Sequence, residues 1–303
     1  MEFVMEFNIE LKQRQEYINT VLDVFLPKVE GKQKTVLEAM RYSVTIGGKR
    51  LRPILMLELY RCFAGTEEEK RVEPMLAAIE MLHTYSLVHD DLPDMDNDIY
   101  RRGQLTTHAK YGSAMAILAG DALLNYSFET IGKAFDFSAS TQWNQSVEKV
   151  MQVFAHKAGI YGMIGGQVVD VEKTGQPLVE EEIEFIYKLK TCALLESAML
   201  VGAILGGANE EQQKDVERIA SCVGMAFQIQ DDILDLIGEE EKLGKPIHSD
   251  EKNQKTTYVT IHGLEQAKQK VKELSEEAVE LAKKLHGTEF LQELITYLTV
   301  REN

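Results

Sequence analysis

The sequence predicts an all-α fold, and three observations support that prediction. Apolar residues recur at intervals of three and four along nearly the whole chain, which is the period of an amphipathic helix. Strict alternation of apolar and polar residues, the pattern of a half-buried strand, is rare. The six prolines fall mostly at the edges of the periodic segments, where they begin or end helices.

Prolines and glycines mark the boundaries of successive predicted helices. In order, helices are predicted over about residues 8–26, 34–46, 53–64, 74–92, 112–134, 144–158, 162–170, 180–206, 210–237, 263–285 and 288–300. Pro27 ends the first helix, and Gly47-Gly48 ends the second. Pro53 and Pro74 open the third and fourth helices, because proline is favoured in a first helical turn. Pro93 should end or bend the fourth.

Length and composition bound the class of protein. With 303 residues the chain could form one large domain or two, and it can bury a substantial core. Its net charge of −16 argues against nucleic acid and anionic membrane surfaces as partners. No segment reaches the roughly 18 uncharged apolar residues of a spanning helix, so we expect no membrane span.

The cysteines and the N-terminus indicate a cytoplasmic protein. Cys62, Cys192 and Cys222 are odd in number, widely spaced and embedded in apolar helical patterns. They therefore resemble reduced core residues more than disulfides or zinc ligands. The N-terminus lacks the basic region and apolar run of a signal peptide.

Two clusters of aspartates follow long apolar helices. The first holds five aspartates within nine residues: Asp90, Asp91, Asp94, Asp96 and Asp98. The second is Asp231-Asp232-Ile233-Leu234-Asp235. Crowded carboxylates at the end of an apolar helix repel one another and are partly desolvated, so a cation is expected there. Either cluster alone could also be a solvated acidic helix end.

The ligand chemistry of these clusters favours Mg²⁺. Asp231 and Asp235 are four residues apart, which places two oxygen ligands on one face of a helix. Carboxylates without His or Cys suit Mg²⁺ better than Zn²⁺. Since Mg²⁺ is usually held by one or two carboxylates plus substrate phosphates, the expected ligand is a metal-bound phosphate or diphosphate.

Basic residues lie where they could bind that diphosphate. Gly47-Gly48-Lys49-Arg50-Leu51-Arg52-Pro53 combines a glycine break, which admits close approach, with three bases. Alone, this stretch would more often be an exposed loop. Arg101 and Arg102 directly follow the first acidic cluster, and Lys190 lies among apolar neighbours where it should meet an anion. Gln167 and Asp170, by contrast, are expected to be buried, hydrogen-bonded polar groups more often than ligands.

Together these motifs resemble the trans-isoprenyl diphosphate synthases. The resemblance covers roughly residues 35–260 in the family's order. It includes the Gly-Gly-Lys-Arg-Leu-Arg-Pro stretch, the two aspartate motifs, Arg101-Arg102-Gly103, Lys190-Thr191, and Gln228 ahead of the second motif. The resemblance implies one domain over residues 1–303, a helical bundle around a central active-site cavity, and a homodimer.

The resemblance also implies a role for each site residue. Mg²⁺ would be held by Asp90, Asp91, Asp96, Asp231, Asp232 and Asp235, with Asp90, Asp96 and Asp231 as principal ligands. Isopentenyl diphosphate would be bound by Lys49, Arg52, His83 and Arg102. The bases Arg101, Lys190 and Lys245 would bind the allylic diphosphate and assist its ionisation, with Lys255 also near phosphate. Thr191, Gln228 and Tyr85 would shield the allylic cation with their dipoles. His248 and Asp94 depart from the family pattern, at the basic loop and inside the first motif.

Product length is predicted from the turn before the first motif. Tyr85 and Ser86 precede Asp90 by five and four residues, and the bulky Tyr85 should form the floor of the tunnel for the growing chain. An aromatic residue there resembles the bacterial farnesyl diphosphate synthase (geranyltranstransferase) type, which implies a C15 product. A geranylgeranyl diphosphate synthase and a non-catalytic subunit of a heteromeric prenyl synthase are the alternatives. A class I terpene cyclase would generally lack the second Asp motif and the Gly-Gly-Lys-Arg-Leu-Arg-Pro stretch.

Overall fold

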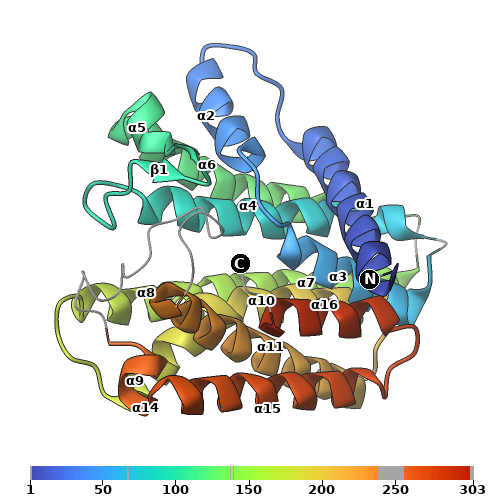
Figure 1. Cartoon of the computed structure of the whole chain (residues 1–303). Coiled ribbons are helices and arrows are strands. Elements are labelled where there is room, and N and C mark those ends of the chain that lie inside the picture. The colour runs from blue at the N-terminus through green and yellow to red at the C-terminus, as the bar shows by residue number, and fades with distance from the viewer. Residues whose placement is uncertain (1, 67, 137, 139, 238–255, 301–303) are drawn as a thin grey trace. The chain divides into compact units, whose positions relative to one another are not determined.

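The computed structural model confirms the all-α prediction (Figure 1). It describes residues 2–66, 68–136, 138, 140–237 and 256–300. Most described residues are helical, and the described strands form one two-stranded hairpin.

The contacts group the chain into two compact units. Unit 1 contains residues 1–57 and 66–151, and unit 2 contains residues 58–65 and 152–303. The single domain implied by the family resemblance stays a prediction.

Unit 1 is built on α4, an almost wholly buried helix. Its elements are α1 (Glu2–Phe25), α2 (Lys34–Thr45), the start of α3 (Leu51–Ala64), η1 (Glu69–Arg71), α4 (Glu73–Asp90), β1 (Tyr100–Arg101), β2 (Gln104–Leu105), α5 (Thr107–Tyr111), α6 (Ser113–Gly132) and most of α7 (Thr141–Ala158). Helix α4 packs chiefly on α6 and also contacts α1 and α2 (Figure 1). Its side chains are buried without interruption from Pro74 to Leu82, because apolar residues surround the helix on all sides.

The β1–β2 hairpin was not predicted from the sequence. Tyr100 pairs with Leu105 and Arg101 with Gln104, so Arg102 and Gly103 form the two-residue turn. Both have positive φ, 54° and 72°, as a type I′ turn requires. The strands are too short to produce a recognisable alternating pattern.

Unit 2 is a second set of packed helices. It contains α8 (Met163–Glu172), α9 (Glu180–Ile186), η2 (Tyr187–Cys192), α10 (Ala193–Gly206), α11 (Glu210–Ile237), α14 (Tyr258–His262), α15 (Leu264–Ala282) and α16 (Glu289–Val300). Helix α11 packs on α15 and α10. The segment predicted as one helix over 180–206 is instead interrupted at η2, which has π-helical hydrogen bonding.

That helical segment also bears on membrane association. Residues Glu180–Gly206 are long and apolar enough to cross a membrane by length and composition alone. However, 78% of the apolar window is buried within the protein, which is typical of a core helix.

Candidate functional site

The first acidic cluster begins where α4 ends. Asp90 is the last helical residue, half-buried, and Asp91 is 3% exposed. Arg101 donates two hydrogen bonds to Oδ1 of Asp91, one from Nε (2.8 Å) and one from a terminal guanidinium nitrogen (2.6 Å). Burial raises the pKa of Asp91, and the Arg101 guanidinium opposes that shift. Asp91 is thus already engaged by a protein cation.

The aspartates beyond Asp91 lie on an exposed loop with a fixed backbone. Asp94, Asp96 and Asp98 are exposed. The Asp96 N–H donates to the carbonyl of Asp90 (2.8 Å), which folds the loop back on the helix end. The carbonyl of Asp98 accepts from the hydroxyl of Thr106 (2.7 Å) and lies 2.8 Å from Nε2 of His108. Carboxylates on this loop can therefore reach a ligand while their backbone is held.

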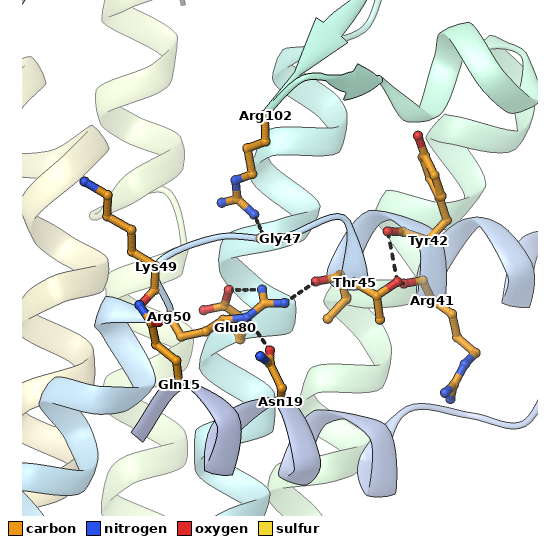
Figure 2. A network of polar contacts seen from close by, with 11 residues as sticks. Gln15, Asn19, Arg41, Tyr42, Thr45, Gly47, Lys49, Arg50, Glu80 and Arg102 are labelled. Atoms are coloured by element: carbon orange, nitrogen blue, oxygen red, sulfur yellow. Dashed lines mark hydrogen bonds and ion pairs between the residues drawn. The ribbon is translucent and has the colours of Figure 1, made fainter. Parts of the chain in front are cut away.

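The glycine-rich stretch places its three bases differently, and Figure 2 shows two of them, Lys49 and Arg50. Lys49 is exposed and Arg52 is half-buried, whereas Arg50 is 4% exposed. Arg50 pairs with the buried carboxylate of Glu80 (2.7 Å) on α4. Arg102 reaches the same loop from the hairpin turn and donates to the carbonyl of Gly47.

His83 lies on α4 among these bases. Burial lowers the pKa of His83 well below its usual value, and the positive charges of Arg52, Arg102, Arg101 and Arg50 lower it further. The imidazole is therefore neutral near pH 7. His83 thus lies near Arg52 and Arg102, two other residues predicted to bind isopentenyl diphosphate, and near Arg101, which is bonded to Asp91. Lys49 is exposed on the loop whose Gly47 carbonyl accepts from Arg102.

Tyr85 and His89 occupy the turn before Asp90. Tyr85 is 5% exposed, and its ring meets His89 edge-on at 5.9 Å between centroids. His89 is structural: its Nε2 lies 3.1 Å from the carbonyl of Ile117, and a Cβ on Gly120 would come within 2.1 Å of it. Ser86 donates to the carbonyl of His83 (2.9 Å). Burial raises the pKa of Tyr85 to about 12, so the residue stays a neutral phenol.

In unit 2 the predicted polar residues meet at η2. Lys190 is within 2.5 Å of Asp170, the anion that its apolar surroundings require. Thr191 donates to the amide oxygen of Gln228 on α11 (2.8 Å). A Cβ on Gly166 would lie 2.3 Å from the backbone N of Lys190, so glycine permits this close packing of α8 on η2. π-Helical turns often occur at functional sites.

The second acidic cluster lies on the last turns of α11, and its members differ in burial. Asp232 is 6% exposed and accepts hydrogen bonds from the hydroxyl of Tyr187 (2.5 Å) and the N–H of Tyr258 (3.2 Å). Asp235 is 5% exposed, and Asp231 is half-buried. Asp232 is therefore engaged by protein donors, as Asp91 is in unit 1.

The oxygen donors fit Mg²⁺. In the part of the chain that the structure describes, no three His, Cys, Asp or Glu side chains form a preassembled metal site. Carboxylate oxygens without nitrogen or sulfur donors suit Mg²⁺, which is usually held by one or two carboxylates together with substrate phosphates. Lys245, Lys255 and His248 lie outside the described residues.

Several site residues were not predicted from the sequence. Tyr187 and Tyr258, which hold Asp232, carry no recognisable signal. Glu80 carries one, because it is a lone acid within an apolar helical run and such a group must meet a cation.

Comparison with known proteins decides the family. The pattern of the polyprenyl synthetase family matches residues 33–298. The chain belongs to this family. It is 43% identical over 262 residues to the farnesyl diphosphate synthase of Geobacillus stearothermophilus, covering 86% of each chain. It is also 43% identical over 274 residues to a geranylgeranyl diphosphate synthase of Cyanophora paradoxa, covering 89% of this chain and 88% of the relative.

A solved structure supports the same assignment. The geranyltransferase of Helicobacter pylori, complexed with magnesium and isoprenyl diphosphate, aligns with a TM-score of 0.82 and 32% identity. The alignment covers 95% of this chain and 94% of that structure. The fold and the family predicted from the sequence are thereby confirmed.

Proposed function

We propose that the chain is a prenyltransferase that condenses isopentenyl diphosphate with dimethylallyl or geranyl diphosphate to give mainly farnesyl diphosphate. The observation that carries the proposal is the basic cluster of unit 1 beside a carboxylate-bearing helix end. Arg52, Arg101 and Arg102 surround the neutral His83. An excess of cationic donors around a neutral imidazole suits a multiply charged anion such as diphosphate.

The residues divide into two groups by the substrate that they bind. Lys49, Arg52 and Arg102 would hold the diphosphate of isopentenyl diphosphate. The neutral imidazole of His83 would donate a hydrogen bond to the same diphosphate. Lys190, kept in place by Asp170, and Arg101, kept in place by Asp91, would bind the allylic diphosphate. Lys245 and Lys255 are proposed for the same role from the family resemblance.

Thr191 and Gln228 would face the allylic carbon skeleton. Their hydrogen bond fixes both side chains, so their dipoles can stabilise positive charge without reorganising. Neither group is a strong nucleophile, so neither would trap an allylic cation.

Mg²⁺ is the proposed cofactor. Asp90, Asp96 and Asp231 would be its principal ligands, and Asp91, Asp232 and Asp235 would support them. Asp91 accepts hydrogen bonds from Arg101, and Asp232 accepts one from Tyr187. When bound, the metal supplies charge neutralisation for the departing diphosphate.

Tyr85 supports a C15 product. It is a large, buried side chain five residues before Asp90, packed edge-on against His89. Its volume would limit growth of the apolar chain. The two relatives, one a farnesyl and one a geranylgeranyl diphosphate synthase, leave product length to be tested.

Product analysis tests the proposal. The purified chain is incubated with isopentenyl diphosphate, dimethylallyl diphosphate and Mg²⁺, and product length is measured; we expect C15. Tyr85→Ala should extend the product to C20 or beyond, whereas Tyr85→Phe should not. A C20 product from the wild type would favour a geranylgeranyl diphosphate synthase. Absence of turnover would favour a non-catalytic subunit.

We also propose a cytoplasmic homodimer. The dimer rests on the family resemblance. The cytoplasmic location is supported by three free cysteines, of which Cys192 and Cys222 are buried. Light scattering of the purified chain would measure its mass against the 34.3 kDa of one copy.

A further inference from the structure

The Arg50–Glu80 ion pair shapes the glycine-rich loop without facing its ligand. We infer that this buried pair is a positioning device that sets the loop so that Lys49, Arg52 and Arg102 meet one diphosphate. The inference rests on the proposed function of this site, which it deepens.

Arg50 is directed into unit 1 by both its backbone and its side chain. Its φ is +53°, which is uncommon and strained for a residue with a Cβ. The guanidinium donates to Asn19 Oδ1 (3.0 Å) and Glu80 Oε1 (2.7 Å), as Figure 2 shows, and to the carbonyl of Val44 (2.7 Å). Each of its three nitrogens is therefore bonded to protein, and Arg50 is a poor candidate for phosphate contact.

These three acceptors come from three helices. Asn19 lies on α1, Val44 at the end of α2, and Glu80 in the middle of α4. One side chain thus ties the loop between α2 and α3 to all three. Because the guanidinium is planar and rigid, its three hydrogen bonds fix the orientation of the loop as well as its distance from the helices.

The loop in turn orients Arg102. Arg102 donates to the carbonyl of Gly47, and a Cβ on Gly48 would lie 2.5 Å from the Arg102 guanidinium. The hairpin turn that carries Arg102 is itself held to α2, since the hydroxyl of Tyr42 donates to the carbonyl of Leu105 (2.6 Å). A shift of the loop would therefore displace Arg102 together with Lys49.

A buried ion pair is weak evidence for a stability role. Replacing both partners by apolar residues of similar volume is often neutral or stabilising, whereas removing one partner is strongly destabilising. A functional role for Arg50 and Glu80 can therefore be separated from a stability role by replacing both together.

The decisive variant is Arg50→Met/Glu80→Leu. It removes one positive and one negative charge, so the net charge near the diphosphate is unchanged and only the loop position is altered. The matched control is Arg41→Met/Asp23→Leu, which removes a more exposed Arg–Asp pair of the same unit. Arg50→Lys is the second variant, because it retains the charge but cannot reach all three acceptors.

The primary measurement is the Kd for inorganic diphosphate without Mg²⁺, by calorimetry. In both Arg50 variants we expect Kd to rise at least about tenfold, equivalent to about 1.4 kcal/mol. KM for isopentenyl diphosphate should rise in parallel, while KM for the allylic substrate should stay within about twofold, a difference of less than about 0.5 kcal/mol. The control variant should match the wild type.

Other results would overturn the inference. It is wrong if Kd in the double variant stays within about twofold of the wild type, or if both KM values rise equally. It is also wrong if the Arg41/Asp23 control weakens binding as much. A wild type that binds diphosphate without catalysing condensation refutes the proposed function alone, and the Kd comparison still decides the role of the pair.

Discussion

Adjacent residues of one motif can have different tasks, and Asp231 and Asp232 illustrate this. Both belong to the second acidic cluster, but only Asp232 accepts hydrogen bonds from Tyr187 and the Tyr258 N–H. On a helix, neighbouring residues point about 100° apart, so one can face the packed interior while the other faces a ligand. The motif predicted the same carboxylate chemistry for both residues; because Asp232 is buried and Asp231 is half-buried, we expect their roles to differ.

Paired substitutions test that separation. Asp232→Asn should lower the free energy of unfolding by about 1–3 kcal/mol, because two hydrogen bonds to a charged acceptor are weakened. Its Mg²⁺ requirement should change little. Asp231→Asn should instead lower stability less, because Asp231 is less buried than Asp232, and should raise the Mg²⁺ concentration for half-maximal turnover. Urea unfolding and a Mg²⁺ titration measure the two effects, and the reverse pattern would contradict the assignment.

His83 gives stability a pH dependence. Because its folded pKa lies below the ordinary 6.5, the unfolded chain takes up this proton first as the pH falls. The contribution of His83 to the free energy of unfolding is fully present above about pH 6.5. It is lost as the pH falls below that value, at up to about 1.4 kcal/mol per pH unit. His83→Gln should make the loss of stability between pH 6.5 and 5.5 shallower. Equal slopes in wild type and variant would refute this, and exposed His286→Gln controls for the substitution.

The three bases of the glycine-rich loop show how far sequence reasoning reaches. The pattern predicted that Lys49 and Arg52 bind anion; Arg52 lies near enough to His83 to lower its pKa, and Lys49 is exposed on the same stretch. Nothing in the pattern indicates that Arg50 turns inward, because its direction depends on a positive φ and on Glu80, 30 residues away. Long-range pairing of this kind leaves no local periodicity.

At the scale of elements, helix existence was predictable and helix interruption was not. The apolar period of residues 180–206 is nearly continuous, which favours one helix. The π-helical η2 within it packs closely on Gly166 of α8, a long-range contact that the apolar period does not encode. The hairpin was missed for a related reason, since two-residue strands carry no period of their own.

Substitution of Gly166 tests whether the geometry of η2 is required for turnover. Gly166→Ala would place a Cβ 2.3 Å from the backbone N of Lys190, so α8 and η2 must separate. We expect turnover to fall at least about tenfold, equivalent to about 1.4 kcal/mol of barrier, with the allylic substrate most affected. Gly132→Ala is the matched control, because a Cβ there meets nothing within 4 Å. Wild-type kinetics in Gly166→Ala would show that the η2 geometry is dispensable.

At the scale of the whole molecule, charge is distributed unevenly. The chain carries −16 overall, yet unit 1 gathers Arg50, Arg52, Arg101 and Arg102 around His83. Long-range attraction therefore does not explain affinity for an anion, and local contacts must provide it. Binding should then depend on metal and on named side chains more than on net charge.

Ligand-induced stabilisation tests this dependence. Mg²⁺ with inorganic diphosphate, at about 100 times Kd, should stabilise the folded chain by about 2.7 kcal/mol, because the unfolded chain has no such site. For a chain of this size that corresponds to a rise in Tm of about 5 °C. Diphosphate alone should give a smaller rise, since only the basic cluster then holds it, and Asp90→Asn should remove the part that depends on Mg²⁺. Thermal unfolding followed by circular dichroism measures each shift. A full shift without Mg²⁺, or an undiminished shift in Asp90→Asn, would mean that the aspartates at the end of α4 do not hold the metal.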